Sequence, residues 1–174
     1  MMKSKIVDAE VLAEKIKALK ACGNTIVSTS GCFDILHAGH VEYLEAAKKK
    51  GDVLIVMLNA DVSVRALKGA QRPVVGQYDR AVVLAGLEAV DYVCIFDELT
   101  PCGLIRQIKP DIIVKGGDYQ GMQIPEMEEA ASYGGTVEYV LLLEGRSTTG
   151  IIKKTAALQT TDAKTSNKNH THER

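Results

Sequence analysis

Two histidines, His37 and His40, flank Gly39 directly after a short β-branched segment and at the start of an amphipathic one. Residues three apart in the first turn of a helix face the same way, so both imidazoles would lie beside the free N–H groups of that turn. The positive end of the helix dipole would add to this surface. Gly39 would let a ligand approach the backbone closely. Together these features predict a pocket for a polyphosphate.

The residues alone leave two other interpretations of the histidine pair open. The imidazoles could have a structural role. Alternatively, Asp34, His37 and His40 could hold a metal ion, although no other ligand with suitable spacing lies nearby.

Three further segments carry residue types that bind phosphate: Asn59 to Arg72, Lys115 to Tyr119, and Glu144 to Thr149. In open parallel α/β sheets, ligands bind where the carboxyl ends of strands meet helix N-termini and glycine-rich loops. The GxGxxG motif is absent. The GxxxxGK[ST] loop is absent too, because Ile151 follows Gly150 where lysine is required. Phosphate binding by other residues is therefore expected.

Helix and strand patterns alternate along the chain and must position these segments. Amphipathic spacing predicts helices over residues 8–21, 40–50, 78–89, 101–108, 124–133 and 148–157. Apolar and β-branched runs predict strands over residues 25–30, 52–58, 92–96, 111–115 and 136–143. This alternation is typical of an α/β domain with a mostly parallel sheet. We expect one domain over residues 1–158, with 1–23 as a helical extension, and a polar, disordered tail over 159–174.

The composition excludes several classes of protein. The 174 residues are 46% hydrophobic, which is enough for a real core in one domain. A formal net charge of −1 argues against binding nucleic acid through its phosphates. The apolar runs are too short for a membrane span, and the N-terminus lacks a signal sequence. We therefore expect a soluble, cytoplasmic protein with reduced cysteines.

The segment Gly31-Cys-Phe-Asp-Ile-Leu-His-Ala-Gly-His resembles the HxGH signature of the nucleotidyltransferase superfamily, which includes cytidylyltransferases and adenylyltransferases. Lys115-Gly-Gly-Asp-Tyr and Gly145-Arg-Ser-Thr-Thr-Gly make the resemblance more specific, toward the adenylyltransferases of ADP-heptose biosynthesis. Similar segments span roughly residues 25–154. The resemblance implies a Rossmann-like parallel sheet flanked by helices, here with an extra N-terminal helix. It also implies that ATP and D-glycero-β-D-manno-heptose 1-phosphate give ADP-heptose and pyrophosphate.

The resemblance also assigns roles to residues. His37 and His40 would contact the triphosphate and steady the transition state, and Lys68 would bridge both substrates. Asn59 and Asp61, with Lys68, would contact the sugar phosphate. Mg²⁺ would be bound mainly through the nucleotide phosphates, with no metal ligand from the protein. The nucleotide would be bound by Gly31, Cys32, Phe33, Gly39, Arg72, Lys115, Gly116, Asp118, Gly145, Ser147, Thr148 and Thr149.

Simpler interpretations remain for several of these residues. Lys68 could be an ordinary surface lysine, and Asp118 could cap its turn. Asn59 and Asp61 could cap the following helix. Ser147, Thr148 and Thr149 could form a helix N-cap, which is compatible with phosphate binding. Cys32 is better explained as a small packed residue than as a reactive thiol.

Departures from related families leave alternatives for the function. The similar glycerol-phosphate cytidylyltransferases carry Arg-Thr-Glu-Gly where this chain has Leu142-Leu-Glu-Gly, which favours ATP over CTP. Close heptose-type relatives often have Asn in place of Ser30, which bears on the acceptor. The alternatives are a cytidylyltransferase acting on a polyol or amino-alcohol phosphate, and a nucleotide-binding sensor. Family habit suggests a homo-oligomer, a dimer or larger.

Overall fold

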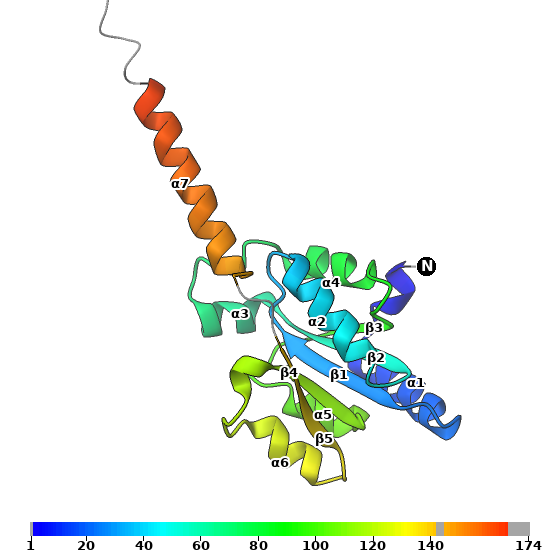
Figure 1. Ribbon diagram of the computed structural model, residues 1–174. Helices are drawn as coiled ribbons and strands as arrows, with labels where there is room; N and C mark the ends of the chain where they lie inside the picture. Colours follow the sequence, from blue (N-terminus) through cyan, green and yellow to red (C-terminus); the bar gives the residue numbers. More distant parts are fainter. Residues whose placement is uncertain (1, 142–144, 167–174) are drawn as a thin grey trace, which may run out of the picture.

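The computed structural model describes residues 2–141 and 145–166 of the chain (Figure 1). Its centre is a five-stranded parallel sheet in the order β3-β2-β1-β4-β5. The strands are β1 (Ile26–Gly31), β2 (Val53–Asn59), β3 (Tyr92–Phe96), β4 (Ile112–Gly116) and β5 (Thr136–Val140). The order reverses between β1 and β4, which is where parallel α/β sheets open a crevice at their carboxyl edge. The predicted Rossmann-like architecture is confirmed.

Helices cover both faces of the sheet (Figure 1). Alternate strand residues point to opposite faces, so the sheet has two cores. Val27 and Val56 pack with α2 and α4 in one core, and Ile26 and Ile55 pack with α1, α5 and α6 in the other. The helices are η1 (Met2–Lys5), α1 (Ala9–Ala21), α2 (Ala38–Lys48), α3 (Asp61–Lys68), α4 (Gln77–Ala85), α5 (Cys102–Ile108), η2 (Gly117–Tyr119), α6 (Pro125–Ala131) and α7 (Thr148–Ser166).

The N-terminal helical segment is an integral part of the domain. Asp8 caps α1 by accepting a hydrogen bond from the Val11 amide, and Leu12 and Ile16 lie fully buried beneath the sheet. Ahead of α1, the Lys5 ammonium donates to the carbonyls of Leu87 and Val90. We therefore expect removal of this segment to expose part of the core.

Two elements differ from the sequence prediction. Helix α3 occupies part of the segment after β2, for which no helix range was predicted. Helix α7 continues to Ser166, although a disordered tail was expected from residue 159; residues 167–174 lie outside the described range. Extending an existing helix costs far less free energy than nucleating one. Figure 1 shows α7 projecting away from the sheet.

Smaller differences concern element ends. Strand β5 ends at Val140, three residues before the predicted end, and residues 142–144 lie outside the described range. Helix α4 ends at Ala85 rather than at residue 89. Within the described residues, no helix has both the length and the apolarity to cross a membrane. The four cysteines form no disulfide with one another.

Candidate active site

A cavity of about 510 Å³ opens at the carboxyl ends of β1, β2 and β4. Ten residues from the sequence prediction line it: Gly31, Cys32, Phe33, His40, Asn59, Lys68, Arg72, Lys115, Thr148 and Thr149. The remaining lining residues include several that the sequence did not single out for this site: Ser30, Asp34, Leu67, Leu99, Thr100, Pro101, Tyr119, Ile124, Pro125 and Glu126. The predicted segments do converge on one cavity.

His37 and His40 stack on each other at the N-terminus of α2, with ring centroids 3.8 Å apart and ring planes 18° from parallel. His40 lines the cavity, and His37 lies behind it as the residue preceding α2. The Nδ1 atoms of both are buried and have no hydrogen-bond partner among the described residues. A buried polar atom without a partner costs free energy, so this arrangement of the pair calls for an explanation beyond packing.

The same surroundings favour the neutral form of both imidazoles. Burial, with a smaller contribution from His37, lowers the pKa of His40 to about 4. Burial, with a contribution from Arg146, also lowers the pKa of His37. Two neutral rings can stack closely where two imidazolium cations would repel. At pH 7 the site therefore presents a neutral pair whose N–H groups can donate to phosphate oxygens.

Gly39 leaves room for this stack in a way that the sequence did not show. A Cβ at this position would lie 3.1 Å from the Cβ of Arg146 and 3.2 Å from two atoms of the His37 ring. Gly39 does not line the cavity. The close approach at Gly39 is therefore made by Arg146 and His37 of the protein itself.

Asp34 organises the loop that carries Arg72. Its Oδ1 accepts hydrogen bonds from the amides of Val74 (2.8 Å) and Val75 (2.9 Å), and its Oδ2 accepts one from Nε of Arg72. Burial would raise the pKa of Asp34, but these three hydrogen bonds outweigh it and lower the pKa. The carboxylate is fully engaged, and within the described residues no three His, Cys, Asp or Glu side chains form a group that could hold a metal. The alternative metal site with His37 and His40 finds no support here.

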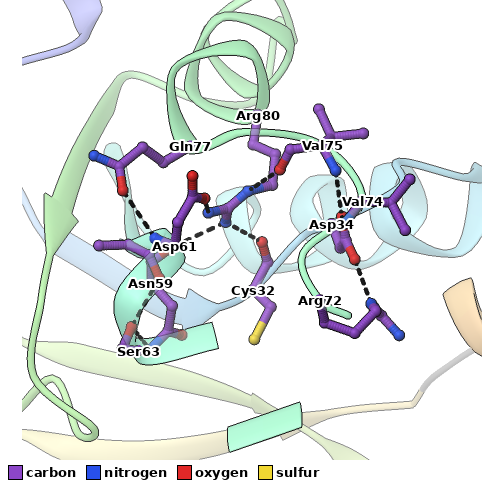
Figure 2. A network of polar contacts seen from close by, with 11 residues as sticks. Cys32, Asp34, Asn59, Asp61, Ser63, Arg72, Val74, Val75, Gln77 and Arg80 are labelled. Atoms are coloured by element: carbon purple, nitrogen blue, oxygen red, sulfur yellow. Dashed lines mark hydrogen bonds and ion pairs between the residues drawn. The ribbon is translucent and has the colours of Figure 1, made fainter. Parts of the chain in front are cut away.

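Arg80 of α4 is a buried residue that the sequence analysis missed (Figure 2). Its Nη1 donates to the carbonyls of Cys32 and Asn59, where the chain leaves β1 and at the end of β2. Its Nε donates to the carbonyl of Val75, and its Nη2 pairs with Asp61 at 2.7 Å. One side chain therefore joins three segments that form the cavity wall. A charged residue within the apolar face of a predicted helix was the signal that could have identified it.

The three residues predicted to contact the sugar phosphate, Asn59, Asp61 and Lys68, differ in their surroundings. Asn59 lines the cavity and donates to Oγ of Ser63 (Figure 2). Asp61 lies outside the cavity lining, with its carboxylate on Arg80 and its amide donating to Gln77. Lys68 is exposed at the end of α3, and its ammonium makes no hydrogen bond or ion pair with any described residue. Lys68 is therefore available to a ligand, whereas Asp61 is already paired.

The segments after β4 and before α7 contribute unequally. Lys115 lines the cavity, but its ammonium is paired with Glu126. Gly116 and Asp118 follow it and do not line the cavity. Gly145 and Ser147 also lie outside the lining. Ser147 caps α7 by accepting from the Gly150 amide.

The first turn of α7 does reach the cavity. Thr148 and Thr149 line it, and Thr148 also donates to the Ile35 carbonyl at 3.3 Å. The N-cap interpretation and a contact with phosphate are thus both accommodated in this turn.

Comparison with known proteins places the chain among nucleotide-transferring enzymes. The profile of the family described as "Cytidylyltransferase-like" matches residues 28–154. The chain is 51% identical over 151 residues to "Bifunctional protein HldE" of Geotalea uraniireducens, and 52% identical over 151 residues to the protein of that name from Pelobacter propionicus. Each match covers 87% of this chain and 31% of the relative, so the chain spans about a third of the length of the curated relatives it matches.

A solved structure shares the fold. The lipopolysaccharide core biosynthesis protein from Thermoplasma volcanium GSS1 is 30% identical, with a TM-score of 0.58. The similarity covers 71% of this chain and all of that one.

Proposed function

The chain belongs to the cytidylyltransferase-like family, and on that premise we propose that it transfers the adenylyl group of ATP to D-glycero-β-D-manno-heptose 1-phosphate. The products are ADP-heptose and pyrophosphate. The observation that carries the proposal is the neutral, unpartnered histidine pair at the N-terminus of α2, beside a cavity that also holds Lys68 and Arg72. The choice of substrates is supported by the similarity to the HldE proteins and to the lipopolysaccharide core biosynthesis protein that shares the fold.

The reaction needs positioning and charge stabilisation more than proton transfer. An oxygen of the acceptor phosphate, already anionic at pH 7, attacks the α-phosphorus of ATP. The bond from that phosphorus to the oxygen bridging to the β-phosphorus breaks, and pyrophosphate leaves with the bonding electrons. Since the nucleophile is anionic, no general base is required. The residues must hold the two anions in line and neutralise the charge that develops.

Residues of the cavity and of the adjoining histidine pair have roles in this proposal. The N–H groups of His37 and His40 donate to the triphosphate, together with the free amides at the start of α2. Lys68 is unpaired and bridges the two anionic substrates. The hydroxyl of Thr149 donates to the triphosphate, whereas the hydroxyl of Thr148 already donates to the Ile35 carbonyl. Arg72, held by Asp34, keeps its terminal nitrogens for the departing pyrophosphate.

Mg²⁺ enters this proposal with the nucleotide, because the described residues bring no set of protein ligands together for it. When bound, it neutralises charge on the phosphate oxygens. The roles given to the side chains do not depend on where it lies. A cytoplasmic location and a homo-oligomeric state remain predictions.

The proposal is tested by measuring pyrophosphate release with Mg²⁺ while crossing ATP, CTP, GTP and UTP against heptose 1-phosphate, glycerol 3-phosphate and phosphoethanolamine. Turnover with ATP and the heptose phosphate, and with no other pair, is expected. Turnover with CTP and a smaller phosphate would keep the mechanism but replace the substrates. Binding of nucleotide without turnover on any acceptor would favour the sensor.

A further inference from the structure

The cavity has two halves, one on each face of the sheet. His40 belongs to the face covered by α2, and the first turn of α7 adjoins it. The side chains of Ser30 and Lys115 point to the other face, because they alternate with Gly31 and Val114 along their strands. Helices α5 and α6 cover that second face, so Glu126 of α6 lies there as well. The sequence analysis assigned Lys115 of this half to the nucleotide and gave Glu126 no role.

Glu126 and Lys115 form a buried ion pair in the wall of this half. Nζ of Lys115 lies 2.6 Å from Oε1 of Glu126 and 3.0 Å from Oγ of Ser30. The side chain of Lys115 is only 8% exposed and that of Glu126 only 7% exposed. The Lys115 ammonium also lies 5.4 Å from the ring centroid of Tyr119. Lys115 is therefore held in place and neutralised, and it cannot be the main cation for a phosphate.

The second oxygen of the same carboxylate is free. Oε2 of Glu126 has no hydrogen-bond partner among the described residues and keeps some accessible surface, in a residue that lines the cavity. Burying two charges costs several kcal/mol per ion, which a pair recovers only with excellent geometry and additional hydrogen bonds. The fold alone gives little reason for this pair, since apolar residues of similar size would serve as well. A ligand that hydrogen-bonds to Oε2 would give the reason.

The chemistry of that ligand follows from the charge. A carboxylate accepts hydrogen bonds from hydroxyl groups and repels phosphate. The unpaired cation Lys68 also lines the cavity, so an anionic group is drawn toward Lys68 and a polyol toward Glu126. The apolar side chains of Leu99 and Pro101 form another part of the wall. A sugar phosphate has both of the required ends.

We propose that Glu126 is a specificity-determining residue for the acceptor: its Oε2 accepts hydrogen bonds from the sugar hydroxyls while Lys115 and Ser30 fix the carboxylate. This inference rests on the proposed function and deepens it, since it says how the enzyme distinguishes the sugar from other phosphates. Sites built to hydrogen-bond a substrate hydroxyl discriminate more strongly than apolar pockets do.

The test is Glu126→Gln, which keeps the size of the side chain and removes its charge. Losing a hydrogen bond to a charged acceptor weakens binding by roughly 10- to 100-fold. We therefore expect the KM for heptose 1-phosphate to rise about 10- to 100-fold, with the KM for ATP changed by less than about twofold. Glu128→Gln is the matched control, because Glu128 lies exposed on the same helix and does not line the cavity. An unchanged acceptor KM, or an equal rise for both substrates, would overturn the proposal.

Glu126→Gln leaves Lys115 buried without its counter-ion and could prevent folding. The double variant Lys115→Met/Glu126→Gln removes both charges together and keeps the site neutral. It is expected to fold, as measured by its thermal melt, and to show the same loss of acceptor affinity. If it binds the acceptor as tightly as the wild type does, Glu126 has only a structural role.

Acceptor binding is also measured by calorimetry without ATP, which separates this inference from the proposed function. If the wild type prefers glycerol 3-phosphate to heptose 1-phosphate, the variants are compared with that acceptor. Weaker binding by Glu126→Gln would then support the inference while the heptose assignment fails. If neither polyol phosphate binds to the wild type, the role of Glu126 is overturned.

Discussion

Two polar groups at the edge of the same cavity differ in how far their hydrogen-bonding atoms are satisfied. The Arg80 cluster consists of the Arg80 side chain, Asp61 and the carbonyls of Cys32, Asn59 and Val75, and all three guanidinium nitrogens donate to a partner (Figure 2). The histidine pair, His37 and His40, stacks tightly and leaves both Nδ1 atoms without a partner among the described residues.

This difference separates structure from function. Buried polar groups whose hydrogen bonds are satisfied fix the geometry around them. Unsatisfied buried atoms also occur at Ser28 and Tyr133, away from the cavity, so the histidine pair indicates a ligand site because it also borders the cavity. We therefore expect substitutions in the Arg80 cluster to reduce stability first and activity as a consequence. Substitutions in the histidine pair should reduce activity and leave stability nearly unchanged.

The largest effect is expected for Arg80→Met. It leaves Asp61 and three carbonyls without their donor, and breaking a buried pair from one side costs about 3–5 kcal/mol of unfolding free energy. Urea unfolding measures this loss. Arg65→Met, at an exposed arginine of α3, is the control and should change stability by less than about 0.5 kcal/mol. A stable Arg80→Met protein that had lost only its activity would contradict the structural role.

His40→Asn should come next and should act on the reaction. Removing one preorganised donor to a developing charge costs about 10²- to 10³-fold in kcat. The free energy of unfolding should stay within about 1 kcal/mol of the wild type, since no described hydrogen bond to the imidazole is lost. Pyrophosphate release and urea unfolding are measured on the same preparation. Equal losses in both would mean that the pair is structural after all.

Gly39→Ala should produce a smaller loss of activity, because the added methyl group crowds the His37 ring of the histidine pair. The added Cβ forces the His37 ring or Arg146 to move by a few tenths of an ångström, and we expect kcat to fall about tenfold. Gly103→Ala in α5 is the matched control, because its Cβ would meet only Oε1 of Glu98, at an ordinary 3.6 Å. Crystal structures or ring chemical shifts would report the displacement. Wild-type kcat in Gly39→Ala would show that the close stack is dispensable.

The smallest effect concerns pH. In the folded protein the pKa of His40 is about 4, below its ordinary value of 6.5, so the unfolded chain binds the proton more readily. The stability that neutral His40 contributes is complete above pH 6.5 and is lost as the pH falls from 6.5 toward 4. Because the ring is partly exposed, we expect this loss to be about 1 kcal/mol. Urea unfolding at pH 7, 5.5 and 4.5 should therefore show a shallower pH dependence of stability for His40→Asn than for the wild type. The same pH dependence in both proteins would exclude His40 as its source.

Much of the fold could be predicted from local patterns. Each predicted strand matches an observed strand, since apolar runs and alternating helices are properties of neighbouring residues. The placement of the HxGH segment at a carboxyl edge follows from the same order, because every strand of a parallel sheet ends on that edge. Helix α3 was missed although it is amphipathic, because its segment was interpreted by its phosphate-binding residue types. The continuation of α7 was missed because residues 159–166 are mostly polar.

The sequence predicted which residue types meet at the site, but it did not predict the hydrogen bonds and ion pairs that they form. Chain order and parallel strand pairing were enough to predict that two histidines, a lysine and a pair of threonines would meet at one edge of the sheet. The pairing of Asp61 with Arg80 and of Lys115 with Glu126 became known from the packed structure. The packed structure also decided that the two imidazoles are neutral. Burial and charge pairing depend on what packs against a side chain from elements distant in the chain, and no local pattern encodes that.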